Sequence, residues 1–334
     1  MIQLSRSINL LKLFLSYCLS RILRQPILWG KPASISIEPT NCCNLYCPEC
    51  PSGMNLLTRE KGSIEPARFK NIIDQLSPTL LYLNLSFQGE PYLHPQFTEM
   101  VKYARSKKIY VSSSTNGHFL TTEKARQTLE SGLDNLIISL DGTDEDTYQI
   151  YRAGGDFRTV ISGIKEIIKQ KKETGNKKPR VIIQFLVLKS NQDHVNLVKH
   201  MGKELGADKV VLKTAQINDF SEGNPLIPDL PGLSRYKKIP KRTGDTASYK
   251  IKNRLPNHCF RVWSKCVVTW DGAVVPCCFD KDAKYRMGNI DRETFNAIWR
   301  NDNFREFRKK ILSSRKSINI CNNCTEGTGW SYFL

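Results

Sequence analysis

Three cysteines of this chain stand at a spacing that suits an iron–sulfur cluster. Cys43, Cys47 and Cys50 form the pattern C-x3-C-x2-C. Three thiolates can hold three irons of a 4Fe–4S cubane, which takes four when every iron has a protein ligand. The remaining iron can bind a cofactor or substrate, as the open position of a catalytic metal site does. A zinc knuckle or inert thiols are the competing interpretation, but the adjacent Cys42 is poorly placed to supply the fourth ligand that structural zinc needs.

This cysteine pattern resembles that of the radical S-adenosylmethionine (SAM) enzymes. The resemblance implies that the open iron of the cluster binds the amino and carboxylate groups of SAM. One electron, from a donor of the flavodoxin or ferredoxin type, then cleaves the sulfonium, and a 5′-deoxyadenosyl radical abstracts hydrogen from a substrate. In such enzymes the cofactors carry out the difficult chemistry while the protein orients and shields them.

Residues 87–91, with the sequence FQGEP, look like the Gly-Gly-Glu-Pro motif with which this family binds the amino group of SAM. Gln88 replaces the first glycine of that motif. Gly89 allows close backbone approach, and Glu90 can accept a hydrogen bond from the cofactor ammonium. Alone, the run would be an ordinary junction between a strand and a turn, and its place one βα unit after the cysteines favours the binding role.

Polar residues also follow the next two predicted strands. Asn116 could contact the SAM ribose or carboxylate, or could form a simple Asn-Gly turn. In peptide-modifying relatives, a serine and an arginine at the places of Ser139 and Arg152 hold the SAM carboxylate, and the fixed donors of a guanidinium suit that role. A surface charge is the alternative for Arg152. Gln184 and Lys213 are further candidates for the barrel lumen.

The segments around these motifs alternate between strand and helix patterns. Six predicted strands are separated by helix-length spacers, which indicates an α/β fold with a parallel sheet. The resemblance implies a partial (β/α)6 TIM-like radical SAM barrel over 31–215, and active sites of such barrels lie at the C-terminal strand ends. Residues 216–258, rich in proline and lysine, are expected to bridge two domains or to form a substrate-facing loop. The strands are predicted at 34–38, 80–87, 109–114, 136–140, 180–188 and 209–214.

A second group of cysteines lies near the C-terminus. An Asp271-Gly272 hairpin signal separates its first two members, and four cysteines can complete one cluster. The pattern resembles the beginning of a SPASM domain, which implies a small SPASM- or twitch-like auxiliary domain at 259–334 with a second 4Fe–4S cluster. Asp280 and Asp282 are candidate proton acceptors near the hairpin. Zinc instead of iron–sulfur, and Cys278 instead of Cys277, are alternatives for the ligand set Cys259, Cys277, Cys321 and Cys324.

The number and distribution of the cysteines indicate the kind of environment in which the protein works. The 334 residues include eleven cysteines that cluster, whereas a disulfide-stapled secreted domain would be shorter and would spread them. This distribution favours metal ligation in a reducing cytoplasm.

The net charge of +18 invites a nucleic-acid interpretation. The basic residues are scattered without an aromatic-interleaved repeat, however, so nucleic acid is not the expected substrate.

Residues 1–30 contain a predicted amphipathic helix at 5–25, with a polar stripe and an opposite apolar face. Lys12 and Arg21 leave no apolar run long enough to span a bilayer. The helix is therefore expected either to pack on the barrel or to lie at a membrane surface. We expect a cytoplasmic protein, with membrane association as the alternative that this helix leaves open.

Together these features favour a radical SAM enzyme of the oxidoreductase or maturase type. In that family a second cluster accepts an electron from a substrate radical or positions the substrate. The expected reaction is an oxidative modification of a peptide or protein. One alternative is a dehydrogenase or epimerase of the same class that acts on a sugar or another metabolite. The other is a non-catalytic iron–sulfur or zinc-binding scaffold, which would have no need of Gly89, Glu90 and Arg152 as a SAM site.

Overall fold

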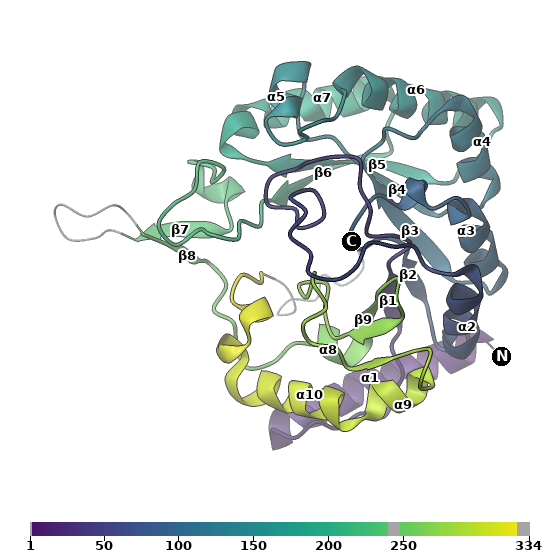
Figure 1. The fold of residues 1–334 in the computed structure, drawn as a ribbon, viewed down its shortest axis with the longest axis vertical. Coiled ribbons are helices and arrows are strands. Elements are labelled where there is room, and N and C mark those ends of the chain that lie inside the picture. Colours follow the sequence, from purple (N-terminus) through teal and green to yellow (C-terminus); the bar gives the residue numbers. More distant parts are fainter. Residues whose placement is uncertain (1, 240–247, 326–334) are drawn as a thin grey trace.

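A curved mixed sheet of nine strands forms the centre of the molecule, in the order β11-β10-β9-β1-β2-β3-β4-β5-β6. The computed structural model of the chain describes residues 2–239 and 248–325. Six neighbouring strands are parallel and curve into a partial barrel (Figure 1). All six strand predictions are confirmed, although β2 is shorter than expected. The strands are β1 (Ser34–Ile37), β2 (Tyr82–Asn84), β3 (Tyr110–Thr115), β4 (Asn135–Ser139), β5 (Arg180–Val187) and β6 (Lys209–Thr214).

Helices cover the convex side of this barrel (Figure 1). Side chains of Thr121 and Asp156 accept hydrogen bonds from the first turns of α4 and α6, which fixes where those helices begin. Gly206, in the left-handed conformation, ends α7. The elements of this layer are α2 (Pro66–Leu76), η1 (Pro91–Leu93), α3 (Phe97–Ser106), α4 (Thr122–Glu130), α5 (Glu145–Gln149), α6 (Phe157–Glu173), η2 (Lys189–His194) and α7 (Val195–Leu205).

Buried and partly exposed residues alternate along the strands, most clearly along β5, so that one set faces the core and the other faces the barrel lumen. Val181, Ile183, Phe185 and Val187 are buried against the helices, whereas the intervening residues are partly exposed. Because successive side chains of a strand point to opposite faces, these intervening positions face the lumen. Gln184 is one of them, so polar groups can be presented inside the barrel without disturbing the core.

The C-terminal region joins the same sheet. The predicted hairpin is confirmed, because β9 and β10 pair antiparallel around a turn with Gly272 at φ +82°. β9 also pairs parallel with β1 and covers what would be the open edge of the barrel. The elements here are α8 (Arg261–Ser264), β9 (Lys265–Val268), β10 (Ala273–Val275), β11 (Gly288–Asn289), α9 (Phe295–Arg300), α10 (Asp302–Ser314), η4 (Arg315–Ser317) and η5 (Asn319–Cys321). Residues 326–334 of the expected auxiliary domain lie outside the described residues.

Two further segments complete the fold. The segment that was expected to bridge the domains contains η3 (Pro231–Leu233) and an antiparallel pair, β7 (Tyr236–Ile239) and β8 (Ser248–Ile251). The predicted N-terminal helix is confirmed as α1 (Ile2–Leu23), which runs beneath the barrel near α8, α9 and α10 (Figure 1).

Candidate active site

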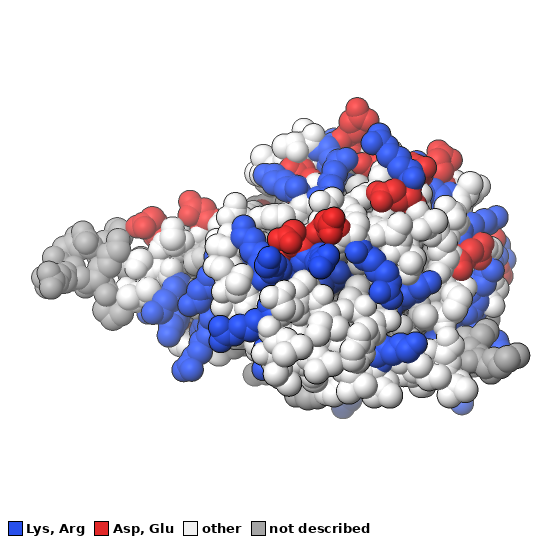
Figure 2. Space-filling view, turned by 90° about the horizontal axis from the view of Figure 1, so that it is seen from below, with Lys and Arg blue, Asp and Glu red and all other residues white. Residues whose placement is uncertain are grey.

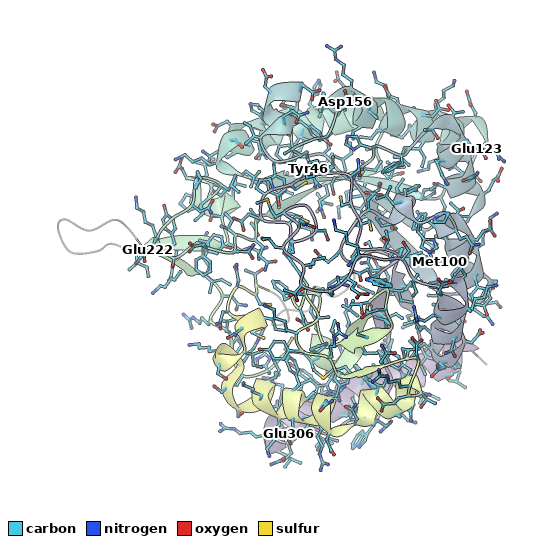
Figure 3. All side chains as sticks on the ribbon, viewed as in Figure 1. Tyr46, Met100, Glu123, Asp156, Glu222 and Glu306 are labelled. Atoms are coloured by element: carbon cyan, nitrogen blue, oxygen red, sulfur yellow. The ribbon has the colours of Figure 1, made fainter. Side chains whose placement is uncertain are left out.

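A cavity of about 480 Å³ opens at the C-terminal ends of the parallel strands. Loops from both halves of the chain line it, including the cysteine loop (residues 41–53), which crosses the mouth of the barrel (Figure 1). The exposed ring of Tyr46 lies over this mouth, whereas Glu123 and Asp156 lie on the outer helical layer (Figure 3). The structure brings together in this cavity all eight residues that were predicted for the first cluster and SAM: Cys43, Cys47, Cys50, Gly89, Glu90, Asn116, Ser139 and Arg152.

The chemistry of the three thiols in the cysteine loop fits a metal cluster. Burial, with smaller contributions from the Glu90 carboxylate and the thiols of Cys50 and Cys47, raises the pKa of Cys43 to about 11. Burial also raises the pKa of Cys47. Without a positive partner, such thiols would remain protonated at neutral pH, whereas a coordinating thiol is deprotonated by the metal. The three sulfurs that line one cavity are therefore suited to bind the irons of a cubane.

Gly89 is required by the backbone of the segment that leads into the cysteine loop. Its φ is +73°, and a Cβ atom there would lie 2.5 Å from the carbonyl oxygens of both Thr40 and Cys42. The next amide, of Glu90, donates a hydrogen bond of 2.8 Å to the Cys42 carbonyl. The close approach expected of this glycine is thus made by the protein itself, and it joins the loop after β2 to the cysteine loop.

The Glu90 carboxylate is almost fully buried and holds two loops together. It accepts hydrogen bonds from the Tyr92 amide (3.1 Å), the Thr115 hydroxyl (2.8 Å) and the Asn116 amide (2.7 Å). Burial raises the pKa of Glu90 to about 6, and these donors partly offset the effect. A carboxylate offers about four acceptor positions, so the three donors leave about one position of Glu90 open.

Arg152 is held in place by Asp141. Its Nε and Nη2 atoms each lie 2.6 Å from Oδ2 of this fully buried aspartate, and its Nη1 donates toward the Cys47 sulfur at 3.8 Å. The other carboxylate oxygen of Asp141 accepts from the Leu186 amide of β5 at 2.7 Å. Burial lowers the pKa of Arg152, but the Asp141 carboxylate together with the neighbouring Cys47 and tyrosine side chains outweighs this effect, and the net pKa lies above the usual value. Arg152 is therefore a positioned cation inside the site rather than a surface charge.

Asp141 is a residue whose role the sequence analysis did not identify. The only indication in the sequence was that this aspartate stands two positions after Ser139, at the end of a predicted strand. An Asp-Gly pair at such a place is equally typical of a turn. Only the fold reveals the partner, because Arg152 lies beyond the intervening helix α5.

Asn116 connects the third strand to the cysteine loop. Its side-chain amide donates to the Asn44 side chain at 2.7 Å, and its side-chain oxygen accepts from the His118 amide. The loops after β2 and β3 thus contact the cysteine loop through hydrogen bonds, and the loop after β4 does so through the Arg152 guanidinium, which donates toward the Cys47 sulfur. This arrangement makes the site rigid, because each loop fixes the others.

The outcomes differ for the remaining candidates. Gln184 and Lys213 both line the cavity, as expected for lumen-facing positions. Asp280 and Asp282 do not line it. The Asp280 carboxylate accepts from the amides of Lys284 and Tyr285 within its own loop, and Asp282 accepts from the Thr58 amide and hydroxyl. These two carboxylates therefore stabilise loops, and they do not face the substrate space.

The two adjacent cysteines of the C-terminal hairpin have different surroundings. Cys278 lines the cavity together with Lys281. A contact with the Cys278 thiol raises the pKa of Cys277, burial raises it further, and Cys259 contributes as well. Cys277 thus lies near another predicted auxiliary ligand, whereas Cys278 lines the cavity at the strand ends. This geometry favours Cys277 over Cys278 as a ligand.

Arg315 lies among the auxiliary cysteines and was not identified from the sequence. Its Nη2 donates to the Cys324 sulfur at 3.5 Å. Burial raises the pKa of Cys321 to about 11, which the guanidinium partly offsets. Within residues 2–239 and 248–325, no three His, Cys, Asp or Glu side chains are arranged around a single metal ion. In a cubane each thiolate binds a different iron, so a wider spacing suits the cluster.

Family models match two parts of the chain. The radical SAM superfamily model matches residues 37–199, and the SPASM iron–sulfur cluster-binding domain matches residues 259–325. The chain belongs to the radical SAM superfamily and carries a C-terminal SPASM domain. Its cofactors are therefore a 4Fe–4S cluster, SAM and an additional iron–sulfur cluster.

Individual proteins resemble most of the chain. The chain is 25% identical over 326 residues to the tungsten-containing aldehyde ferredoxin oxidoreductase cofactor-modifying protein of Pyrococcus furiosus, covering 86% of each. It is 26% identical over 317 residues to the PqqA peptide cyclase of Streptomyces rochei, covering 90% of this chain and 80% of the relative. The solved structure of BtrN in complex with AdoMet and 2-DOIA aligns with a TM-score of 0.56 at 22% identity, covering 89% of this chain and 94% of that chain. This likeness confirms the predicted α/β fold with a partial barrel.

Proposed function

We propose that this protein cleaves SAM reductively at a cluster bound by Cys43, Cys47 and Cys50 and oxidatively modifies a peptide or protein substrate. When bound, the cluster and SAM supply a 5′-deoxyadenosyl radical that abstracts hydrogen from the substrate. The observation that carries the proposal is a single cavity in which these three thiols face Glu90 and the positioned Arg152.

The residues of the chain bind and orient the cofactor in this proposal. The Arg152 guanidinium, fixed by Asp141, and the Ser139 hydroxyl hold the SAM carboxylate. The free acceptor position of Glu90 and the backbone at Gly89 receive the SAM ammonium. Because the Glu90 carboxylate and the Arg152 guanidinium are held by hydrogen bonds before SAM binds, these two groups need little ordering on binding.

The segment after β6 excludes water from one side of the site. Ile217 and Tyr236 pack with Leu45 and Cys47 in one buried cluster. The Tyr236 hydroxyl donates to the Ile217 carbonyl at 3.2 Å and accepts from the Ile217 amide at 2.8 Å. A reactive radical needs such a wall, because exclusion of water prevents side reactions.

The lining of a second cavity favours a peptide substrate. A second cavity of about 880 Å³ follows the inner faces of the strands and shares Gln184 and Lys213 with the first. The first cavity would hold the cluster and SAM, and the volume of the second lies within the range of about 300–1,000 Å³ that is typical of ligand sites, so the lining of the second cavity is what indicates the substrate class. The charged residues described along the second cavity are all cationic: Arg180, Lys209, Lys213 and Arg261. A peptide with acidic side chains fits this lining, and the likeness to a peptide cyclase supports the same substrate class.

Formation of 5′-deoxyadenosine tests the first part of the proposal. Anaerobically reconstituted protein with dithionite and SAM should form this product, and alanine at Cys43, Cys47 or Cys50 should abolish it. Cys321→Ala should retain much of the SAM cleavage but stop product formation from the substrate. Protein that holds both clusters and never cleaves SAM would instead be the non-catalytic scaffold.

Isotope transfer tests the substrate class. Peptides prepared from cells grown in heavy water should transfer deuterium into 5′-deoxyadenosine, as measured by mass spectrometry. The small-molecule fraction of the same cells serves as the comparison. Deuterium transfer from that fraction alone would favour a dehydrogenase or epimerase that acts on a metabolite.

A further inference from the structure

The N-terminal helix α1 turns its polar stripe toward the protein. The Arg6 guanidinium donates to the carbonyls of Lys107 and Lys108 at 3.0 and 2.7 Å. The Asn9 side chain exchanges two hydrogen bonds of 2.8 Å with the backbone of Lys31. Ser20 donates to the Ile27 carbonyl at 3.0 Å. Packing on the protein, which was one of the two expectations, is therefore achieved through these hydrogen bonds together with the buried side chains of Leu13 and Tyr17.

The apolar stripe of α1 consequently faces away from the protein. Amphipathic helices on globular proteins normally bury this stripe against the core. Five large aliphatic side chains are exposed at helical steps of four, three, four and seven residues, with exposed fractions between 43% and 75%: Leu4, Ile8, Leu11, Leu15 and Ile22. Such a continuous apolar surface marks a site of interaction with a partner or a membrane.

Cationic groups border this apolar surface. Lys12 and Arg21 are exposed on α1, and no acidic residue occurs among residues 1–37. In Figure 2, which views the molecule from the side of α1, α9 and α10, the lower part shows an uncharged area bordered by blue groups, with no red among the described atoms. This combination is typical of helices that lie in the interface of an anionic membrane.

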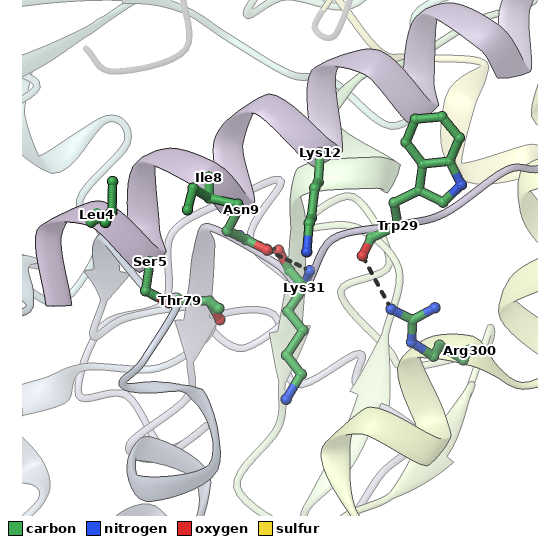
Figure 4. A pocket seen from close by; sticks show the side chains of 9 residues that line it. All are labelled: Leu4, Ser5, Ile8, Asn9, Lys12, Trp29, Lys31, Thr79 and Arg300. Carbon is green, nitrogen blue, oxygen red and sulfur yellow. Dashed lines mark hydrogen bonds between the residues drawn. The ribbon is translucent and has the colours of Figure 1, made fainter. Parts of the chain in front are cut away.

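A pocket beside α1 adds a place for an anionic headgroup. Its volume is about 410 Å³, and Lys12, Lys31 and Arg300 line it together with Trp29 (Figure 4). No Asp or Glu is among the described lining residues. The Arg300 guanidinium donates to the Trp29 carbonyl at 3.3 Å, which fixes the cation next to this aromatic residue. Tryptophan is enriched at membrane–water interfaces, where its amphipathic ring lies at the level of the headgroups.

A second copy of the chain fits this surface less well. A twofold interface places the same patch of both subunits together. The cations around the apolar stripe would then face the same cations of the other copy, and this like-charge contact is unfavourable. A bilayer with anionic lipids instead supplies both an apolar interior and opposite charge.

We propose that α1 and the adjoining cationic pocket dock the protein on the surface of a membrane that contains anionic phospholipids. The apolar stripe enters the boundary between headgroups and acyl chains, and Lys12, Lys31 and Arg300 contact lipid phosphates. Among the described residues, no helix is long and apolar enough to cross a membrane. Docking therefore leaves the barrel outside the bilayer, with α1 parallel to its surface.

Vesicle flotation of the full-length protein tests this docking. Vesicles of equimolar phosphatidylcholine and phosphatidylglycerol should carry the protein to the top of the gradient, and pure phosphatidylcholine vesicles should carry much less. Ile8→Ser/Leu15→Ser should reduce the bound fraction about tenfold, since each loses apolar area that enters the interface. Lys12→Glu should reduce binding to the anionic vesicles, and added salt should weaken it.

The matched control is Leu197→Ser/Leu230→Ser, which removes two leucines of similar exposure outside α1 and should leave flotation unchanged. Thermal melting and iron content show whether each variant is folded. Equal flotation of Ile8→Ser/Leu15→Ser and the wild type would overturn the proposal. Absence of flotation, together with a dimer in light scattering that Ile8→Ser/Leu15→Ser abolishes, would overturn it in favour of an interface between copies.

Discussion

The contact between Asp141 and Arg152 makes the sharpest prediction about the site. Asp141→Asn removes the charge that pairs with Arg152 and retains one acceptor oxygen. If that oxygen keeps the Leu186 amide, the new amide group faces the donors of Arg152 and repels them. We expect both a loss of stability and a loss of SAM affinity, because the guanidinium would be left buried and misdirected.

The expected magnitudes follow from the geometry. Breaking a buried ion pair by removing one partner costs about 3–5 kcal/mol, and Asp141 is fully buried. For a chain of 334 residues, the entropy of unfolding is about 0.7 kcal/mol/K, so the melting temperature should fall by about 4–7 °C. A hydrogen bond to a charged group contributes about 1.5–3 kcal/mol, so SAM should bind about 10- to 100-fold more weakly.

Asp134→Asn is the matched control, because Asp134 lies at the opposite end of the same strand. It is 1% exposed and accepts from the Val111 amide at 2.8 Å and from Arg105 at 2.7 Å. Its replacement should lower the melting temperature to a similar extent. SAM affinity should remain at the wild-type level, because Asp134 is far along β4 from the cavity and contacts none of its residues.

Equilibrium dialysis of SAM and thermal melting, both under anaerobic conditions, measure the two effects separately. Asp141→Asn should move both quantities and Asp134→Asn only the melting temperature. If Asp141→Asn bound SAM as tightly as the wild type while melting earlier, the pair would be structural, and the assignment of Arg152 to the SAM carboxylate would be refuted.

Three further predictions concern backbone strain, proton binding and cluster ligation. Gly89→Ala should prevent assembly of the first cluster, whereas Gly175→Ala, also at positive φ but with open space around it, should cost only about 1–2 kcal/mol. Burial raises the pKa of Glu90 from 4.5 to about 6, so the folded state binds this proton more tightly than the unfolded state. The stability that the proton contributes is fully present below pH 4.5 and is lost as the pH rises through 6, which lowers the melting temperature. Glu90→Gln should remove this pH-dependent fall in melting temperature. Cys277→Ala should lose about four irons per chain, and Cys278→Ala none.

Iron and melting measurements decide these predictions. Full iron content in Gly89→Ala would mean that the cysteine loop tolerates a side chain at this position. A wild-type melting temperature that rises between pH 4.5 and 6 relative to Glu90→Gln would reverse the sign expected from burial. Loss of iron in Cys278→Ala rather than Cys277→Ala would exchange the roles of the two cysteines.

Local sequence patterns were sufficient to predict the helices and strands and to identify the cysteine motif. The β5 alternation and the spacing of Cys43, Cys47 and Cys50 depend on neighbours within a few residues, so the chain alone carries them. The Asp271-Gly272 hairpin is local in the same sense. Its pairing partner is not, because β9 joins β1, which lies more than two hundred residues earlier in the chain.

The orientation of α1 on the protein could not be predicted from the sequence pattern. Its amphipathic period predicted the helix and both of its stripes, but not which stripe meets the protein. That choice depends on the backbone carbonyls of residues 107 and 108 and on the Lys31 backbone, which become available to Arg6 and Asn9 only in the folded chain.

The amino-acid sequence by itself was sufficient to predict the radical SAM family, the parallel α/β barrel and the set of residues that line one cavity at its strand ends, because motifs and periodicity are properties of contiguous residues. Tertiary structure alone decided that Asp141 holds Arg152, that Cys278 lines the cavity at the strand ends and that α1 presents its apolar stripe outward. These three features depend on contacts that no local pattern specifies, because the partner of a buried charge or the outward side of a helix is fixed only after the chain has folded.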